Sequence, residues 1–218
     1  YVNCNLSAIT IKCEPTDFYV FTVEEQHILV DYLLTDPEPR KLGILVSLYT
    51  GIRVGELCAL KWGDIDLDTK LLSVTKTMQR IRDIEYSASS SYKTKIDISS
   101  PKSRSSIRVV PLTDFLVDIL REYKKSDDTY FLTGHSKFFV EPRNMQHFFE
   151  GVTKATGITK ANYHSLRHTF ATRCVEAGFE IKTLSEILGH SSVNITLNRY
   201  VHTSLEMKRA NMNKLTLR

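Results

Sequence analysis

Apolar residues recur at helical spacing along most of the chain, and capping residues, glycine and proline mark where each run stops. Thr22 with Glu25 three residues later predicts a helix start, and Asp36-Pro37 predicts the end of that helix. Gly51 predicts the end of the next helical run, because glycine is common just after the last residue of a helix. The predicted helices cover about residues 22–36, 40–50, 54–60, 113–125, 144–156, 163–177, 181–188 and 196–200.

The period of the pattern changes to two in the middle of the chain. Runs rich in β-branched residues predict strands over residues 65–67, 71–76 and 107–111, and a short extended segment over residues 130–132. Residues 79–100 are polar and serine-rich, and they are too long for a hairpin turn. Two interpretations of this stretch stay open at this point, an extended ribbon or a mobile loop.

Composition places the chain among ordinary globular proteins, with 42% hydrophobic and 25% charged residues in 218. No apolar run approaches the ~20 residues of a membrane span, and no signal-peptide pattern opens the chain. The four cysteines lack CxxC spacing, which argues against a disulfide scaffold or zinc knuckle. A reducing cytoplasm is the location that this cysteine usage predicts.

The net charge of +4 hides an uneven distribution. Acidic residues dominate between residues 14 and 40, whereas Lys and Arg outnumber Asp and Glu over residues 70–125 and again over residues 199–218. A basic middle and tail favour a polyanionic partner. A solvated surface of mixed charge explains the same numbers, so charge alone does not decide between these interpretations.

Histidine and arginine pairs supply candidate chemistry. His164 and Arg167 are three residues apart at a predicted helix start, so they share a face and can converge on one anion. His164 and His168 could instead bind a metal, but the HExxH glutamate is missing and carboxylates are scarce nearby. We therefore predict no metal site.

Three further side chains could take part in phosphate chemistry, but each can also be explained by an ordinary structural role. Arg53 lies in an apolar segment, where its charge needs a partner, either Glu56 or a substrate phosphate. Lys102 near a turn is usually a solvated lysine, and Tyr200 alone is usually a core or interface residue. Two arginines from distant segments would form a planar clamp for a phosphorane.

Four motifs in order resemble the tyrosine recombinases, the phage integrase family. Residues 50–60, TGIRVGELCAL, resemble its first box, and residues 164–172, HSLRHTFAT, resemble its second. Residues 188–192, LGHSS, with the later YVH of residues 200–202, resemble the third. Residues 101–112, with Lys102, resemble the lysine-bearing hairpin of integrases of conjugative transposons.

The resemblance implies an α+β fold, predominantly helical, with a small three-stranded antiparallel sheet. It implies site-specific recombination for integration and excision through a 3′-phosphotyrosyl intermediate, with no metal, ATP or other cofactor. It also implies a nucleophile, a supporting acid Glu56, and a set of residues around the phosphate. The implied catalytic residues are Arg53, Lys102, His164, Arg167, His190 and the nucleophile Tyr200.

The resemblance extends over about residues 20–203, which we take as the catalytic domain. Residues 1–19 are expected to be a linker remnant, since the family usually carries DNA-binding domains before this one. Residues 204–218 are too apolar for a free tail, and we expect them to pack on a neighbouring protomer. The implied partners are double-stranded DNA at element ends and target sites, other copies of the chain in a tetramer, and an accessory excision factor.

The polar stretch of residues 79–100 is predicted to contact DNA beside the crossover. It leads into the hairpin that carries Lys102, and its ends are basic, with Tyr86 and Tyr92 as stacking groups. A solvated basic loop is the alternative. The predicted DNA contacts are Arg80, Arg82, Lys93, Lys95, Arg104 and Arg108.

Two other classes of function remain open at this stage. A metal-dependent nuclease could use His164, His168 and His190, and EDTA-sensitive cutting would favour it. A non-catalytic DNA-binding module could use residues 183–190 and the helix after them as a helix-turn-helix. Binding without nicking would favour that second alternative.

Overall fold

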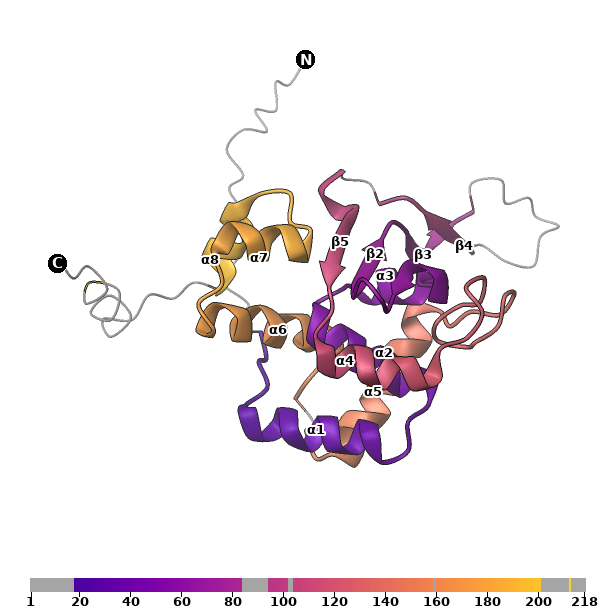
Figure 1. Cartoon of the computed structure of the whole chain (residues 1–218), viewed down its shortest axis with the longest axis horizontal. Helices are drawn as coiled ribbons and strands as arrows, with labels where there is room; N and C mark the ends of the chain where they lie inside the picture. The colour runs from indigo at the N-terminus through magenta and orange to yellow at the C-terminus, as the bar shows by residue number, and fades with distance from the viewer. Residues whose placement is uncertain (1–17, 84–93, 102–103, 159, 201–211, 213–218) are drawn as a thin grey trace, which may run out of the picture.

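The fold is built from eight α-helices and two small sheets within the residues that the computed structural model describes, which are 18–83, 94–101, 104–158, 160–200 and 212 (Figure 1). Most of the tail prediction, all of it except residue 212, and most of the linker prediction therefore fall outside the described residues. The helices are α1 Val23–Thr35, α2 Pro39–Thr50, α3 Val54–Ala59, α4 Asp114–Tyr123, α5 Pro142–Ala155, α6 His164–Glu176, α7 Ile181–Leu188 and α8 Val193–Tyr200.

The helix ends follow the local chemistry that the sequence displays. The Thr22 side chain accepts a hydrogen bond from the Glu25 backbone, and the Glu25 carboxylate accepts one from the Thr22 backbone, which completes a capping box before α1. Gly51 ends α2 with φ 66°, a left-handed conformation that favours glycine. Helix α8 begins at Val193, earlier than predicted, because Ser192 accepts hydrogen bonds from the Asn194 and Ile195 backbones.

A three-stranded antiparallel sheet confirms the predicted fold class. Its strands are β1 Ile65–Asp66, β2 Leu71–Val74 and β5 Arg108–Pro111, in the order β1-β2-β5. Leu72 pairs with both Ile65 and Val110, and all three side chains are buried. The extended segment predicted at residues 130–132 is wrong: Tyr130 makes only isolated bridges to Lys61 and His135, within a turn.

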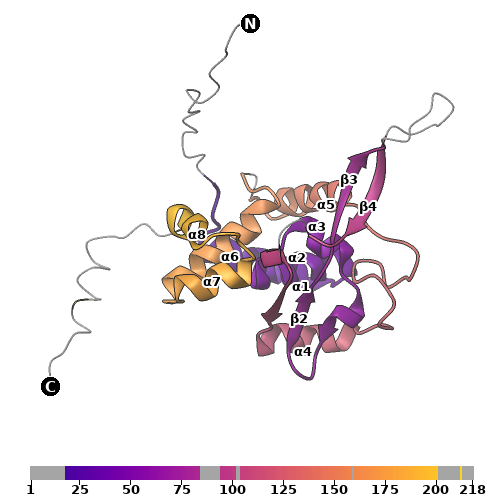
Figure 2. The same ribbon diagram turned by 90° about the horizontal axis from the view of Figure 1, so that it is seen from above.

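Residues 77–99 form a second, two-stranded antiparallel ribbon where the structure describes them. Strand β3 Thr77–Arg82 pairs with β4 Thr94–Ser99 in a register that joins Met78 to Ile98. Met78 is buried, and Ile96 and Ile98 pack against the same core, which ties the base of the ribbon to the body. The ribbon interpretation was therefore correct for both strands, which project from the body in Figure 2.

The core has two parts. The larger one lies between α1–α5 and the sheets. A smaller cluster joins α6, α7 and α8 through Ala171, Cys174, Leu184, Leu188 and Tyr200, and these helices form one group in Figure 1. Tyr200 is thus a core residue as well as the predicted nucleophile. Among the described residues, no helix has the length and apolarity needed to cross a membrane.

Candidate active site

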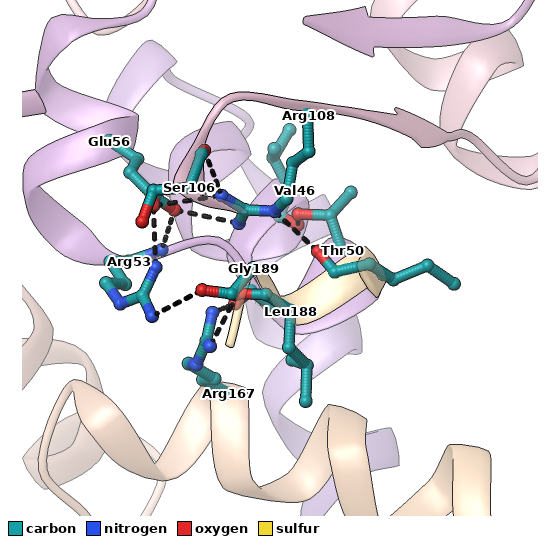
Figure 3. A network of polar contacts seen from close by, with 11 residues as sticks. Val46, Thr50, Arg53, Glu56, Ser106, Arg108, Arg167, Leu188 and Gly189 are labelled. Atoms are coloured by element: carbon teal, nitrogen blue, oxygen red, sulfur yellow. Dashed lines mark hydrogen bonds and ion pairs between the residues drawn. The ribbon is translucent and has the colours of Figure 1, made fainter. Parts of the chain in front are cut away.

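The carboxyl end of α7 is where three arginines converge. The last carbonyls of a helix have no partner within it and carry the negative end of the helix dipole, so guanidinium groups are favourable there. Each of three consecutive carbonyls accepts a bond from a different arginine (Figure 3). The pairs are Arg108 Nε with Ile187 O at 2.5 Å, Arg167 Nη2 with Leu188 O at 2.7 Å, and Arg53 Nη2 with Gly189 O at 3.2 Å.

Gly189 makes this convergence possible. Its φ of 64° is left-handed, which turns the chain out of α7 toward His190. A Cβ added at this position would lie 3.0 Å from Arg108 Nη1 and 3.1 Å from the Ser105 carbonyl oxygen. The glycine is therefore required by its conformation and also by the close approach of the arginine.

Arg167 is almost fully buried, with 3% of its surface exposed. Its second backbone partner is the carbonyl of Gly51, 2.6 Å from Nη1, so the guanidinium lies between the carboxyl ends of α2 and α7. Burial and the charge of Arg53 lower the pKa of Arg167 to about 9, which still leaves it protonated at neutral pH. These two bonds use only part of the five N–H donors of an arginine, so the remainder can meet an anion.

Glu56 is the counter-charge behind the arginines. Its carboxylate accepts from Arg53 Nη1 at 2.9 Å and from the Arg53 backbone at 2.8 Å, so the predicted Arg53–Glu56 pair is present. The same carboxylate also accepts two bonds from Arg108, at 3.0 and 2.9 Å. Burial disfavours the ionised form, but the bonds and charges of Arg108 and Arg53 outweigh it and lower the pKa of Glu56. One negative charge is thus shared between two guanidinium groups.

Arg108 does not have the role that the sequence predicted. Its side chain is 6% exposed, and its guanidinium is bound to Glu56 and to the backbone carbonyls of Ser106 and Ile187. All three nitrogens of this guanidinium are bonded within the protein, unlike those of Arg167, so Arg108 has few donors left for a phosphate, which corrects the prediction of a DNA contact. Instead, Arg108 ties β5 to α3 and to the end of α7 (Figure 3).

Tyr200 lies on α8 beside these groups, with 6% of its surface exposed. Its hydroxyl is 2.9 Å from His168 Nδ1, and its ring is parallel to that of His190 at a centroid distance of 6.5 Å. Burial raises the pKa of the phenol, although the charges of Arg167 and Arg199 oppose the shift. His168 was expected only as a candidate metal ligand, and its contact with Tyr200 has no sequence signal because the two residues are far apart in the chain.

His164 and His190, the other two histidines of the cluster, are neutral in this state. His190 Nδ1 is 2.8 Å from Thr196 Oγ1, so α8 orients the ring. Burial and then the charge of Arg167 lower the pKa of His190 to about 3, and desolvation with the same charge lowers the pKa of His164 to about 4. Arg53, His164, Arg167, His190 and Tyr200 thus belong to one cluster built from α3, α6, α7 and α8.

The other predicted residues are distributed differently. Lys102 and Lys93 lie outside the described residues, as does the side chain of Arg104. On the ribbon, Arg82 is exposed. Arg80 is 2.7 Å from Glu141 at the start of α5, and Lys95 is 3.2 Å from Asp83. The ribbon arginine Arg80 therefore has a protein partner that DNA would have to share or replace.

The depressed histidine pKa values give a stability prediction for the DNA-free protein. His168 has a pKa lowered to about 3 by burial and the nearby His164, whereas an unfolded histidine titrates near 6.5. The unfolded chain takes up this proton as the pH falls below about 6.5 and the folded protein does not, so stability is lost on that side. We expect His168 alone to cost roughly 1 kcal/mol by pH 5.5.

Urea unfolding at pH 7.5, 6.5 and 5.5 measures this effect. The His168→Asn variant should lose less stability over the same interval than the wild type, because the titrating group is gone. Identical pH dependence in the two proteins would contradict a neutral His168 in the folded state.

Known proteins with similar sequences are phage integrases and tyrosine recombinases. A model of the phage integrase family matches residues 20–207. A XerC-like tyrosine recombinase of Caldanaerobacter subterraneus is 32% identical, over 75% of this chain and 46% of that protein. The transposase of transposon Tn916 from Enterococcus faecalis is 26% identical, over 94% of this chain and 56% of that protein. The chain thus spans about half the length of these relatives.

Solved structures share the fold. The integrase of transposon Tn1549 in complex with a circular intermediate DNA has a TM-score of 0.71 at 24% identity, covering 94% of this chain and 69% of that one. The XerA recombinase has a TM-score of 0.63 at 26% identity, covering 94% and 68%.

Proposed function

Because the chain belongs to the phage integrase family, we propose that it is the catalytic part of a site-specific DNA recombinase of a mobile element. It cleaves and rejoins DNA for integration and excision, through a 3′-phosphotyrosyl intermediate. The proposal depends on one observation above all: Arg53 and Arg167 are fixed at the same helix end, and a tyrosine lies beside them. A phosphoryl transfer to tyrosine needs these groups gathered in one place.

The arginines bind the phosphate and stabilise its transition state. Arg53 has an exposed side chain and Arg167 has unused N–H donors behind it, and the backbone bonds to Gly51, Leu188 and Gly189 hold both guanidinium planes before DNA arrives. His164 and His190 add neutral hydrogen-bonding groups beside them. Glu56 holds Arg53 in place without cancelling the local positive charge, because Arg108 shares that carboxylate.

The covalent step then follows from the chemistry of a phosphodiester. The Tyr200 oxygen forms a bond to phosphorus, the bond from phosphorus to the 5′ oxygen breaks, and the phenol proton is released. Lys102 is the proposed acid that gives a proton to the leaving 5′ oxygen. Attack by another 5′ hydroxyl on the phosphotyrosine reverses these changes and joins new strands, so neither ATP nor a metal is consumed.

The two other functions have weaker support. For a metal-dependent nuclease, Nδ1 of His168 is engaged by Tyr200 and Nδ1 of His190 by Thr196. Within the described part of the chain, no three His, Cys, Asp or Glu side chains gather to hold a metal. Helices α7 and α8 do follow each other through a turn, as in a DNA-binding module. A module of that kind does not require two arginines and a tyrosine gathered at one helix end.

Covalent capture tests the proposal directly. The protein is incubated in EDTA with nicked, radiolabelled duplexes that carry candidate element ends, so that the cleaved fragment diffuses away. We expect a protein–DNA adduct that survives denaturation and that protease converts to a peptide on the 3′ end. Cutting without an adduct, and only with metal, would support the nuclease instead.

The assembly and partners are also part of the proposal. We propose double-stranded DNA at element ends and target sites, a tetramer on that DNA, and an accessory excision factor. Structures of the Tn1549 integrase contain transposon-end or circular-intermediate DNA, which supports the first of these. A bacterial cytoplasmic location, on the nucleoid, accompanies it.

The ribbon β3–β4 is proposed to contact DNA beside the crossover. Arg82 and Lys95 are exposed on it, and the ribbon projects from the body on the side away from α4 (Figure 2). Replacing both with alanine should weaken DNA binding and flatten its salt dependence. The slope of log K against log salt should change by about 0.9 for each phosphate that the protein no longer neutralises.

Arg121→Ala is the control, because Arg121 is an exposed arginine of α4, and α4 lies on the other side of the body from the ribbon (Figure 2). Its slope should match the wild type. Equal slopes for all three proteins would place the ribbon in solvent.

A further inference from the structure

The Tyr200 hydroxyl is held by a residue that has no part in the phosphate site. Its partner is Nδ1 of His168, at 2.9 Å, and both residues are 6% exposed. His168 follows Arg167 in α6, but the guanidinium of Arg167 is bound to α2 and α7 while the imidazole faces α8. The Tyr200 oxygen, which must attack phosphorus, is therefore hydrogen-bonded to the buried imidazole of His168.

Phe18 closes the other side of this pair. Its ring is stacked on that of His168, with a centroid distance of 4.3 Å and an interplanar angle of 19°. It also meets the Tyr200 ring edge-on at 5.7 Å. Phe18 precedes α1, so the contact joins the segment before α1 to α6 and α8.

The segment that carries Phe18 is fixed along α6 by polar contacts. The Phe21 backbone N–H donates to Thr169 Oγ1 at 2.9 Å, and Thr169 is the residue after His168. Arg173, one turn further along α6, donates to the Phe21 carbonyl and to Gln26 Oε1, each at 2.7 Å. Displacement of the segment before α1 would therefore remove Phe18 from His168 and Tyr200.

The position of the phenol is unsuited to attack. The side chain of Arg53, which would hold the phosphate, is 38% exposed, whereas Tyr200 is nearly inaccessible. To attack a phosphorus, the hydroxyl must give up its bond to His168 and the buried ring must become accessible to DNA. Burial also keeps the phenol protonated, because it raises the pKa.

We propose that His168 is a positioning residue that holds the Tyr200 hydroxyl in a buried, unreactive place, and that Phe18 keeps this place closed. DNA engagement that shifts the segment before α1 releases the nucleophile. The inference rests on the proposed function, since it assigns Tyr200 the attacking role. Burial first, and then His164, Arg199 and Arg167, keep the His168 ring neutral by lowering its pKa, and Tyr200 is the other titratable group in contact with it.

Four variants test the proposal. Phe18→Ala opens the cover, and His168→Leu removes the hydrogen bond while it fills similar space. His168→Asn retains a polar atom near the position of Nδ1. Phe179→Ala is the matched control, because Phe179 is a partly exposed phenylalanine, 43% accessible, just after α6.

The first measurement needs no DNA. N-acetylimidazole acetylates accessible phenols, and mass spectrometry of the Tyr200 peptide follows the rate. Phe18→Ala and His168→Leu should react about two- to tenfold faster than the wild type, the range that one neutral hydrogen bond is worth. His168→Asn should recover most of the wild-type protection, and Phe179→Ala should retain it. Unchanged acetylation in both Phe18→Ala and His168→Leu would overturn the proposal.

The second measurement is single-turnover adduct formation on the nicked duplex. Phe18→Ala should form the adduct faster by a similar factor, with unchanged DNA affinity. Faster acetylation with slower adduct formation would also overturn the proposal, because His168 and Phe18 would then hold Tyr200 in place for attack. If the wild type forms no adduct while acetylation responds as expected, the proposed function fails and the buried contact stands.

Discussion

Replacing Tyr200 with phenylalanine is expected to abolish covalent attachment to DNA and to leave DNA affinity within about twofold. Only the attacking oxygen is removed, because the ring stays in the cluster with Ala171, Cys174 and Leu184. The variant should be about 1–3 kcal/mol less stable, since His168 Nδ1 is left without its buried partner. Denaturing gels measure the adduct, and binding to an uncleavable duplex measures the affinity.

Tyr163→Phe is a matched control for this experiment. Tyr163 is another buried tyrosine, and its hydroxyl lies 2.9 Å from Ser47 Oγ, so the substitution also removes one buried hydrogen bond. It should lower stability in a similar way and still form the adduct. An adduct at normal yield in the Tyr200→Phe protein would identify a different nucleophile.

The ends of the helices were predictable because the chemistry that sets them is local. The Thr22 capping box and the left-handed Gly51 each involve residues within one or two turns, and their sequence signals are specific. The β3–β4 ribbon was harder to identify. Its pattern has too few apolar positions to distinguish a ribbon from a loop, and the deciding contacts of Met78, Ile96 and Ile98 are with the core.

The contacts of the site also fall into local ones, which the sequence predicts, and long-range ones, which it does not. The pairs Arg53–Glu56 and His164–Arg167 are three residues apart, so helical spacing alone indicates a shared face. The second partner of Glu56 could not be predicted, because Arg108 comes from a strand far along the chain. The polar and basic residues before Arg108 in the sequence also suggested that it lies on the surface. The same holds for His168, whose contact with Tyr200 depends on how α8 packs on α6.

The buried ion pair of Arg108 and Glu56 could be identified only in the folded structure, for a physical reason. A buried guanidinium is tolerated only where enough acceptors surround it, and those acceptors here are mainly backbone carbonyls at helix ends. Backbone carbonyls carry no signature in a sequence. Gly189 was the nearest available signal, because a glycine after α7 predicts a helix end with exposed carbonyls.

Arg167→Lys should reduce the single-turnover rate of cleavage by about 10²–10³-fold, the usual cost of losing one preorganised donor to a transition-state oxygen. Arg167 spans two carbonyls, at 2.6 and 2.7 Å, that belong to different helices. A lysine keeps the charge but concentrates its donors on one nitrogen, so it cannot span both carbonyls and also present a flat pair of donors to the phosphate. The loss should appear in the rate more than in DNA affinity, because exposed basic residues supply much of the binding.

The Arg53→Lys variant separates the two effects of the substitution. Arg53 is partly exposed, and its guanidinium makes one bond to Glu56 and one to Gly189, so its replacement should lower the cleavage rate strongly and stability only slightly. Arg121→Lys is the control, since Arg121, on α4, bonds the backbone carbonyl of Leu67, away from the site. Rapid-quench cleavage at saturating protein, with unfolding measured in parallel, gives both quantities. Wild-type rates in Arg167→Lys and Arg53→Lys would show that neither arginine clamps the phosphate, whatever the geometry at the end of α7.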